Sequence, residues 1–196
     1  MNRLTFFETI RVEDGGICNL ELHIKRSLET IHRHFGIIYR IPFEEILDNY
    51  SKQDGIFKLR VVYSDKLISH TLNKYTPQPL SCVKVVDCND IEYSYKFENR
   101  SRLESLRALR GRCDDILIVK KGFVTDTSYG NLLFKLKGDT CIYTPETCLL
   151  RGTKREQMLC NGLIKERELT KDKLSDCEAF YMINAMVDPI QIAIEF

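Results

Sequence analysis

Lys96 is a lysine in an aromatic setting, within Tyr93-Ser94-Tyr95-Lys96-Phe97. Aromatic neighbours can withdraw an amine from water, and a desolvated lysine becomes a nucleophile that forms Schiff bases with carbonyl compounds. The alternative is a surface lysine whose stem packs on Tyr95 while its ammonium group reaches water. These residues taken alone favour the surface lysine, because most lysines are solvated.

The segment from Gly122 to Asn131 is rich in hydroxyl groups and contains one acidic residue, Asp126. A carboxylate in such a segment could pair with a protonated ring nitrogen. The alternative is an Asx turn, in which Asp126 accepts hydrogen bonds from nearby backbone amides. Without further context the turn is the simpler interpretation.

Gly152 precedes a predicted helix over residues 153–161. The first amides of a helix have no partner within the helix, and together with the helix dipole they attract an anion. Thr153, followed three residues later by Glu156, also fits a capping box in which side chains satisfy those amides. The two interpretations are compatible with each other.

Arg26 lies near the start of another predicted helix, in His23-Ile24-Lys25-Arg26. A positive charge at this end opposes the helix dipole. A bound phosphate group would relieve that repulsion, whereas a solvent-facing arginine is the simpler explanation. Each of these four signals is weak by itself, so composition and the order of the elements have to supply the context.

The composition is that of a soluble globular chain. Its 196 residues are 43% hydrophobic and 29% charged, which suits one large domain or two small ones. The formal net charge is +1 and the basic residues are dispersed, so nothing predicts a nucleic-acid or membrane partner. No apolar run approaches the roughly 20 residues of a membrane span, and the first residues show no signal peptide.

The cysteines give no metal signature. Eight occur without any CxxC pair, and no histidine pair has the spacing of zinc ligands, so we predict no metal site. Because no export signal is evident, we expect reduced thiols in a cytosolic protein, most of them buried as small hydrophobic side chains.

Hydrophobic periodicity predicts an α+β first half. A strand-like run extends from Leu4 to Val12, and apolar residues at helical spacing predict a helix between Asn19 and Gly36. Alternation predicts a strand over residues 57–62, with residues 67–74 as its hairpin partner. We place the domain boundary between Tyr75 and Tyr95, which gives a small N-terminal domain (1–80), an interdomain linker (81–95) and a larger domain (96–196).

The larger predicted domain has many short strands and few helices. We expect helices over residues 99–110 and 153–161, and strands over residues 116–119, 123–125, 132–135, 141–143, 179–183 and 190–196. Such a pattern favours a mixed, barrel-like or sandwiched sheet.

Six sequence blocks, distributed over nearly the whole chain, occur in an order that is specific when they are taken together. They are Phe7–Val12 with Asp14-Gly15, His23–Leu28, Lys96–Arg100, Gly122–Phe134, Leu149–Arg155 and Asn184–Met186. They resemble, in turn, F-E-x-I-R, H-x-x-R-L, K-x-x-N-R, G-x-V-x-E-x-x-x-x-N-L-F, L-x-G-x-x-R and N-A-[LM]. These are motifs of the class IV aminotransferase family, the fold-type IV pyridoxal-phosphate enzymes, which include branched-chain and D-amino-acid aminotransferases and 4-amino-4-deoxychorismate lyase. Relative to that family the chain is shortened at the N-terminus.

The resemblance implies a fold and a cofactor. The fold would be a small N-terminal α/β sandwich plus a C-terminal barrel-like sheet with helices, with pyridoxal 5'-phosphate in the cleft between them, assembled as a homodimer. Lys96 would form the Schiff base and shuttle the substrate proton. Asp126, where the family usually has glutamate, would pair with the pyridinium nitrogen, and Arg26 would bind the phosphate bidentately. The implied phosphate site is completed by backbone amides at Gly152, Thr153 and Lys154 and by the Asn184-Ala185 turn.

Thr9 discriminates between reactions of the family. Aminotransferases commonly have glycine or another small residue here, whereas the lyase has a threonine that donates a proton to departing pyruvate. A strand residue without a role is the alternative. The blocks at Lys96 and Asn184 also resemble the lyase, which eliminates pyruvate from aminodeoxychorismate to leave 4-aminobenzoate, a folate precursor.

Two other functions remain open, and one residue is unassigned. The chain could be an aminotransferase acting on a branched-chain or D-amino acid, or a catalytically silent cofactor-binding relative. We expect a small-molecule substrate, for which relatives usually carry an arginine loop after the segment that matches Val61–Ser64. Here Asp65-Lys66 follow, so the residue that binds the substrate carboxylate is not identified.

Overall fold

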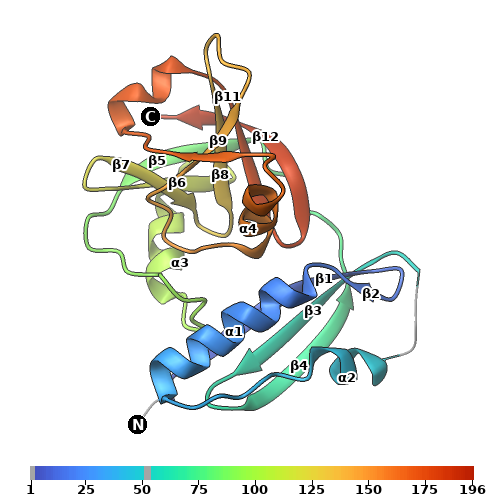
Figure 1. Ribbon diagram of the computed structural model, residues 1–196. Coiled ribbons are helices and arrows are strands. Elements are labelled where there is room, and N and C mark those ends of the chain that lie inside the picture. The colour runs from blue at the N-terminus through green and yellow to red at the C-terminus, as the bar shows by residue number, and fades with distance from the viewer. Residues whose placement is uncertain (1–2, 51–53) are drawn as a thin grey trace. The chain divides into compact units, whose positions relative to one another are not determined.

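The computed structural model describes residues 3–50 and 54–196. The chain forms two compact units, whose elements are labelled in Figure 1. Unit 1 comprises Met1–Pro77 and Tyr95–Asn99, and unit 2 comprises Gln78–Ser94 and Arg100–Phe196.

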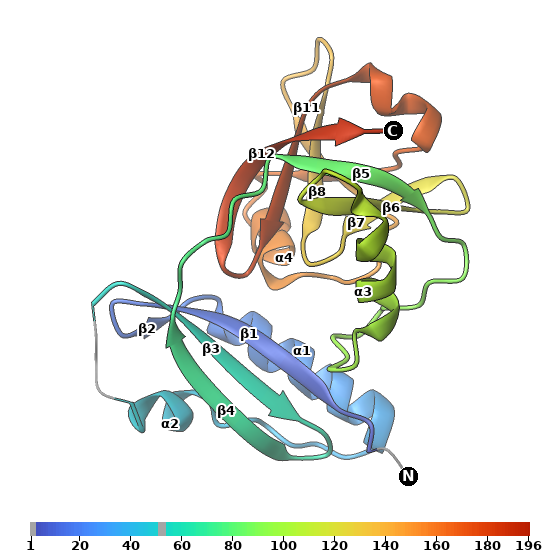
Figure 2. The ribbon, with the colours of Figure 1, turned by 180° about the vertical axis from the view of Figure 1, so that it is seen from behind.

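Unit 1 is an antiparallel sheet with helices on one face. Its strands are β1 (Phe6–Glu13), β2 (Gly16–Ile17), β3 (Ile56–Tyr63) and β4 (Leu67–Lys74), in the order β2-β1-β3-β4. The helices are α1 (Leu20–Phe35) and α2 (Phe43–Asp48). Figure 2 shows β1, β3 and β4 in front of α1, so the viewer sees the face of the sheet that this helix does not cover.

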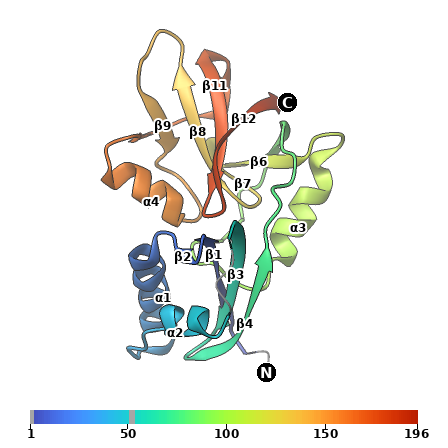
Figure 3. The same cartoon turned by 90° about the vertical axis from the view of Figure 1, so that its right-hand side faces the viewer.

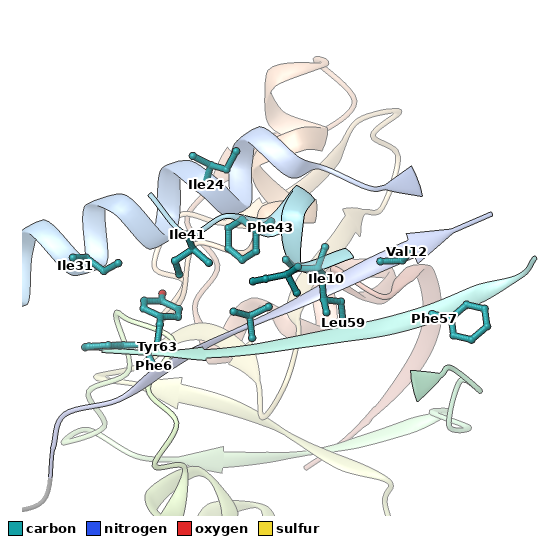
Figure 4. Close-up of a cluster of buried hydrophobic side chains, with 12 residues drawn as sticks. Phe6, Ile10, Val12, Ile24, Ile31, Ile41, Phe43, Phe57, Leu59 and Tyr63 are labelled. Carbon is teal, nitrogen blue, oxygen red and sulfur yellow. The ribbon is translucent and has the colours of Figure 1, made fainter. Parts of the chain in front are cut away.

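The core of unit 1 lies between the sheet and the helices (Figure 4). Phe6 and Ile10 lie on the same face of β1, while Ile24 and Ile31 recur at helical spacing along α1. All four side chains are buried together. The predicted helix limits are met: Asn19 and Gly36 flank α1, and the φ of 70° at Gly36 suits glycine.

A separate segment extends the unit 1 sheet. Residues 95–98 run antiparallel to β1, because Phe6 and Phe97 form a bridge and Glu98 N donates to Thr5 O at 2.9 Å. Tyr95 and Phe97 pack on Phe6, with ring centroids 6.5 and 5.0 Å away. This packing holds the segment in unit 1.

Unit 2 is built around a sheet that closes on itself (Figure 3). The strand order is β10-β9-β8-β11-β12-β5-β6-β7, and a further pairing of β7 with β8 closes the strands from β8 to β7 into a barrel. The strands are β5 (Cys82–Asp87), β6 (Asp115–Lys120), β7 (Phe123–Thr127), β8 (Asn131–Leu136), β9 (Ile142–Pro145), β10 (Lys165–Arg167), β11 (Cys177–Asn184) and β12 (Val187–Glu195).

The strongest sequence signals of unit 2 lie in its most buried elements. Ile116–Val119 of β6 are fully buried, as their continuous run of large aliphatic residues predicts. Lys121 and Gly122 both have positive φ, which suits the tight hairpin to β7. The helices are α3 (Ser101–Arg107), followed by the 3₁₀ helix η1 (Ala108–Arg110), then α4 (Thr153–Cys160) and the 3₁₀ helix η2 (Lys171–Asp176).

The structural division differs from the predicted one at two places. β5, which lies in the predicted linker, is an interior strand of the barrel because it pairs in parallel with both β12 and β6. Lys96, predicted to belong to the larger domain, belongs to unit 1 because its neighbours Tyr95 and Phe97 enter that core.

The cysteines also require a correction. Cys82 and Cys113 form a disulfide, with 4.9 Å between their Cα atoms, where the sequence predicts reduced thiols. They meet because β5 runs parallel to β6, so the start of β5 lies beside the residues that precede β6. Of the six free cysteines only Cys88 and Cys177 are buried, so the expectation that most are buried is also wrong.

Candidate active site

Lys96 projects from the face of the unit 1 sheet opposite α1, which we call the second face. Phe7 N donates to Lys96 O at 3.0 Å, so the lysine lies directly beside β1. Side chains alternate along an extended segment, and the flanking Tyr95 and Phe97 enter the core. The half-buried lysine therefore points the other way, and its Nζ lies 4.7 Å from the centroid of the Phe7 ring. The aromatic setting predicted for Lys96 is present.

Thr9 and Arg60 belong to the same second face. They are directly opposite each other in the register of β1 and β3. The guanidinium carbon of Arg60 lies 4.2 Å from the centroid of the Phe7 ring, and one of its nitrogens lies 3.1 Å from Glu98 Oε1. The Phe7 ring is thus contacted by two cations, Arg60 and Lys96, and such contacts attract a cation to the ring face.

Arg60 is a functional candidate that the sequence analysis misses. The family's carboxylate-binding loop is sought after Ser64, whereas Arg60 precedes that position within β3. The alternation of Leu59 and Val61 with Arg60 does put the arginine on the polar face of a predicted strand. The missing information is the register, because only the pairing with Thr9 brings Arg60 to the candidate site.

Glu8 is a buried carboxylate on the α1 side of the sheet, between two basic side chains of that helix. His23 Nδ1 lies 2.6 Å from one carboxylate oxygen, and Arg26 Nε donates to the other at 2.9 Å. Burial would raise the pKa of Glu8, but the charge of Arg26 and the hydrogen bond from His23 overcome it and lower the pKa to about 2. Glu8 is therefore ionised, and burial lowers the pKa of His23, which favours a neutral imidazole that donates from Nδ1.

Arg26 binds Glu8 through one edge of its guanidinium group. Nε and one terminal nitrogen both contact the Glu8 carboxylate. A bidentate phosphate contact of the kind implied by the resemblance would have to use the edge formed by the two terminal nitrogens. Glu8 thus fixes the direction in which Arg26 presents that second edge.

Asp126 is the corresponding buried carboxylate of unit 2, with 5% of its surface exposed. Leu149 N and Leu150 N donate to Oδ2 at 2.8 and 3.0 Å, and Asn131 Nδ2 donates to Oδ1 at 2.8 Å. Burial raises the pKa of Asp126 to about 6, although these donors and the charge of Arg155 oppose the rise. Because its amide donors are 23 and 24 residues further along the chain, the local Asx turn is not the right interpretation.

The start of α4 has the form of an anion site. Gly152 is the N-cap residue, and no side chain of the described residues caps the helix there. Thr153 is consequently the first helical residue, so the predicted capping box with Glu156 does not form. The Glu156 carboxylate instead accepts a hydrogen bond from Arg155 Nη1 at 2.9 Å. The amides of the first turn, which include those of Thr153 and Lys154, remain the groups that an anion would meet.

The turn between β11 and β12 lies beside this helix end (Figure 3). Asn184 Oδ1 accepts hydrogen bonds from Met186 N at 2.8 Å and Val187 N at 3.2 Å, which folds the chain tightly around Ala185. An ion pair of 2.7 Å joins Lys154 of α4 to Asp188 of β12. The predicted phosphate residues from two distant parts of the sequence are therefore neighbours within unit 2.

Arg155 has a structural role that the sequence analysis leaves unassigned. Its side chain is fully buried, donates to Pro145 O at 3.3 Å and pairs with Glu156 and with Glu166 at 2.5 Å. The last residue of the L-x-G-x-x-R motif thus anchors α4 to β9 and β10. Through these contacts it fixes the N-terminal end of α4 against the two strands.

The predicted site residues fall into two groups. Thr9, Arg26 and Lys96 belong to unit 1, whereas Asp126, Gly152, Thr153, Lys154, Asn184 and Ala185 belong to unit 2. Among the described residues, none of the helices is long and apolar enough to cross a membrane.

Residues 5–193 match the model of the family described as amino-transferase class IV. The chain belongs to this family, so the family and the two-domain α+β fold predicted from the sequence are confirmed. The predicted pyridoxal-phosphate cofactor is confirmed through family membership.

Several known proteins are similar over most of their length. An uncharacterised protein of Haemophilus influenzae is 36% identical over 184 residues, which cover 92% of this chain and 96% of the relative. A Haemophilus somnus protein, provisionally named a 4-amino-4-deoxychorismate lyase, is 30% identical with a TM-score of 0.84, over 95% of this chain and 98% of that one. A pyridoxal-phosphate-bound aminotransferase of Mycobacterium tuberculosis, named as hypothetical, shares the fold at 17% identity and a TM-score of 0.74, over 97% of this chain and 81% of that one.

The residues present fit the cofactor. Pyridoxal phosphate needs an amine for its aldehyde, an anion site for its phosphate and an acid for its ring nitrogen. Lys96 is an amine held against an aromatic ring, α4 begins after a glycine N-cap, and Asp126 is a buried acid whose hydrogen-bond donors are all neutral. The last point matters most, because a buried carboxylate with no cation hydrogen-bonded to it is one that a pyridinium group would stabilise.

Proposed function

We propose that the protein is a pyridoxal-phosphate-dependent lyase that acts on aminodeoxychorismate or a close analogue. The reaction splits the substrate into 4-aminobenzoate and pyruvate: one ring proton is lost, the C–O bond to the enolpyruvyl group breaks, and the released enol takes up a proton. Pyridoxal phosphate, when bound, supplies the electron sink for this chemistry.

Three residues of the second face carry the proposed steps. Lys96 Nζ would hold the cofactor and would accept the proton from the substrate carbon. Thr9 Oγ1 donates a proton to the departing enolpyruvate. Arg60 binds a substrate carboxylate, because its guanidinium group offers two parallel donors of the right spacing.

The observation that carries the proposal is the composition of this face. Lys96 and Arg60 both lie over the Phe7 ring, and Thr9 is opposite Arg60 in the strand register. An amine, a hydroxyl group and a carboxylate-binding cation are thereby offered on one face of one sheet. This is the set that proton removal, proton return and substrate anchoring require.

Unit 2 and one residue pair of unit 1 are proposed to hold the cofactor. Asp126 would keep the ring nitrogen protonated, and the first amides of α4 at Gly152, Thr153 and Lys154, with the Asn184-Ala185 turn, would bind the phosphate. Arg26, held by Glu8, would add a guanidinium contact to that phosphate. The neutral donors around Asp126 support the first role, and the absence of a capping side chain in the described residues at α4 supports the second.

Thr9 favours the lyase over an aminotransferase. Its position on the second face, opposite Arg60, agrees with a group that delivers a proton to the substrate. The Haemophilus somnus relative that is 30% identical carries the lyase name, which supports the same choice. If Thr9 were a strand residue without a role, there would be no reason for it to lie opposite Arg60 or for a relative to carry the lyase name.

Product analysis of the cofactor-loaded protein with aminodeoxychorismate tests the proposal. We expect equal amounts of 4-aminobenzoate and pyruvate, and a kcat lowered about 100-fold or more in Thr9→Val, as for loss of a general acid. Thr71→Val is the matched control, because Thr71 is opposite Arg60 on the other side, in β4. We expect it to keep wild-type turnover.

Two outcomes would replace this proposal with another. Conversion of the bound cofactor to its pyridoxamine form by an amino donor such as D-alanine, without pyruvate release from aminodeoxychorismate, would make the protein an aminotransferase. Normal cofactor binding without turnover of either substrate would make it a catalytically silent relative.

The proposal includes a homodimer and a folate-pathway role, as the family resemblance implies, and it keeps the cytoplasmic location expected from the sequence. Light scattering on the cofactor-loaded chain measures the first directly. A mass of one chain at micromolar concentration would contradict the dimer and leave the reaction untouched.

A further inference from the structure

Asn131 joins the two cofactor-binding features of unit 2. It is the first residue of β8 and lies opposite Asp126 of β7, in the register pair that closes the barrel. Its side chain is buried, with 5% exposure. A polar side chain in this position has to find its partners within the protein.

The amide nitrogen of Asn131 is shared between two acceptors. It donates to Asp126 Oδ1 at 2.8 Å and to Leu150 O at 2.8 Å. A side-chain amide has two N–H donors, so both are used. Leu150 belongs to the turn before α4, and the backbone of this turn also binds Asp126, because Leu149 N and Leu150 N donate to Asp126 Oδ2. Asp126, Asn131 and the turn before α4 therefore form one closed ring of hydrogen bonds.

The amide oxygen of Asn131 reaches the cap of α4. A Cβ atom added to Gly152 would lie 2.1 Å from Asn131 Oδ1, closer than any real contact allows. The φ of −72° at Gly152 is open to every residue, so the glycine is needed for space and not for conformation. Asn131 is thus in van der Waals contact with the residue that begins the anion site.

We propose that Asn131 is a positioning residue that fixes the Asp126 carboxylate and the phosphate-binding end of α4 at one spacing. The inference rests on the proposed function and deepens it, since the two ends of the cofactor would then be bound as one unit. Asn131 touches neither the substrate nor the reacting atoms in this scheme, and it acts through Asp126 and the Leu150–Gly152 turn.

Two variants separate positioning from simple folding. Asn131→Ala removes both hydrogen bonds, whereas Asn131→Asp keeps the side-chain shape and replaces the donors by acceptors that face Asp126 and Leu150 O. Thr144→Val is the matched control: Thr144 is fully buried in the same unit, and its Oγ1 donates to Leu132 O at 2.9 Å. It removes one buried hydrogen bond that is not attached to Asp126.

Equilibrium binding of pyridoxal phosphate to the full chain is the measurement, with thermal melting to verify folding. We expect Asn131→Ala to weaken binding roughly 10- to 100-fold, as for loss of a hydrogen bond to a charged group. Asn131→Asp should weaken it at least as much, and Thr144→Val should leave it within about twofold while lowering the melting temperature.

A double-variant comparison identifies the route of the effect. If Asn131 acts through Asp126, then Asp126→Asn weakens binding much less in the Asn131→Ala background than in the wild type. Fully multiplicative effects, or wild-type affinity in a folded Asn131→Asp variant, would overturn the inference. A wild-type chain that binds no pyridoxal phosphate would overturn the proposed function as well, so the two failures are distinguishable.

Discussion

The two units each bury a carboxylate, and the two carboxylates respond to burial in opposite ways. Glu8 of unit 1 is fully buried beside Arg26, and its pKa falls to about 2. Asp126 of unit 2 is almost as deeply buried among neutral amide donors, and its pKa rises to about 6. The difference in partner, not in burial, decides the sign of the shift.

This contrast separates a structural acid, Glu8, from an acid that is suited to bind a cationic ligand, Asp126. Glu8 already has its cation, so its charge holds α1 on the sheet and orients Arg26. Asp126 is held in place by Leu149, Leu150 and Asn131, none of which carries a charge. A pyridinium nitrogen would add a cation in direct contact with this carboxylate, whose hydrogen-bond donors are neutral and which feels Arg155 only as a nearby charge, and this is the physical reason to expect the cofactor ring there.

The largest effect should follow from breaking the ion pair of unit 1. In Glu8→Gln the shape is kept, but the fully buried carboxylate that pairs with His23 and the partly buried Arg26 loses its charge, and breaking a buried pair typically costs about 3–5 kcal/mol. Glu13→Gln is the matched control on the same strand, where the exposed pair with Arg11 should contribute about 1 kcal/mol or less. Urea unfolding of the cofactor-free proteins gives both values, and equal losses would erase the distinction between the two carboxylates.

The next effect concerns substrate rather than stability. Arg60→Gln should raise the KM for a carboxylate substrate roughly 10- to 100-fold, because a charge-assisted hydrogen bond is lost. Its kcat and its affinity for pyridoxal phosphate should stay near the wild-type values. Lys58→Gln, two residues earlier on β3, is the control. A loss of cofactor affinity in Arg60→Gln with KM unchanged would assign this arginine to the cofactor instead.

The smallest effect is a pH dependence set by Asp126. Below about pH 6 this carboxyl group is neutral, so affinity for pyridoxal phosphate should fall by up to about tenfold per pH unit. The cofactor-free chain responds with the opposite sign. Because the pKa is raised in the folded state, the stability cost of Asp126 appears as the pH rises from 3.8 to about 6.

A matched variant isolates that dependence from the titration of the cofactor's own phosphate. In Asp126→Asn the cofactor's phosphate still titrates, but the carboxyl group is gone. Binding should therefore be weak at every pH, and the part of its pH dependence that comes from Asp126 should disappear. Dissociation constants between about pH 5 and about pH 8 are sufficient. Identical pH profiles for wild type and Asp126→Asn would contradict the assignment of Asp126.

Local elements were predictable where one physical rule dominates. Ile24 and Ile31 recur at helical spacing before Gly36, and α1 follows them. The aliphatic run Ile116–Val119 becomes the most buried strand for a similar reason. β5 was not predictable as a barrel strand, because its partner β12 lies more than a hundred residues further along the chain and nothing local indicates a parallel pairing.

The site divides in the same manner. Lys96, Asp126 and Gly152 lie in motif blocks that can be recognised from the sequence, so the sequence alone identifies them as candidates. Arg60 becomes a candidate only through the strand register with Thr9, and Asn131 only through the barrel closure. The Cys82–Cys113 disulfide likewise depends on strand adjacency. Tertiary pairing is what the linear sequence does not display.

Covalent attachment of the cofactor at Lys96 is the central claim, and borohydride trapping with peptide mass mapping tests it most directly. The full chain reconstituted with pyridoxal phosphate should show a visible absorbance band that Lys96→Ala abolishes and Lys66→Ala preserves. Reduction should fix the cofactor on the peptide that contains Lys96. A band that survives in Lys96→Ala, or a reduced adduct on another lysine, would contradict the account.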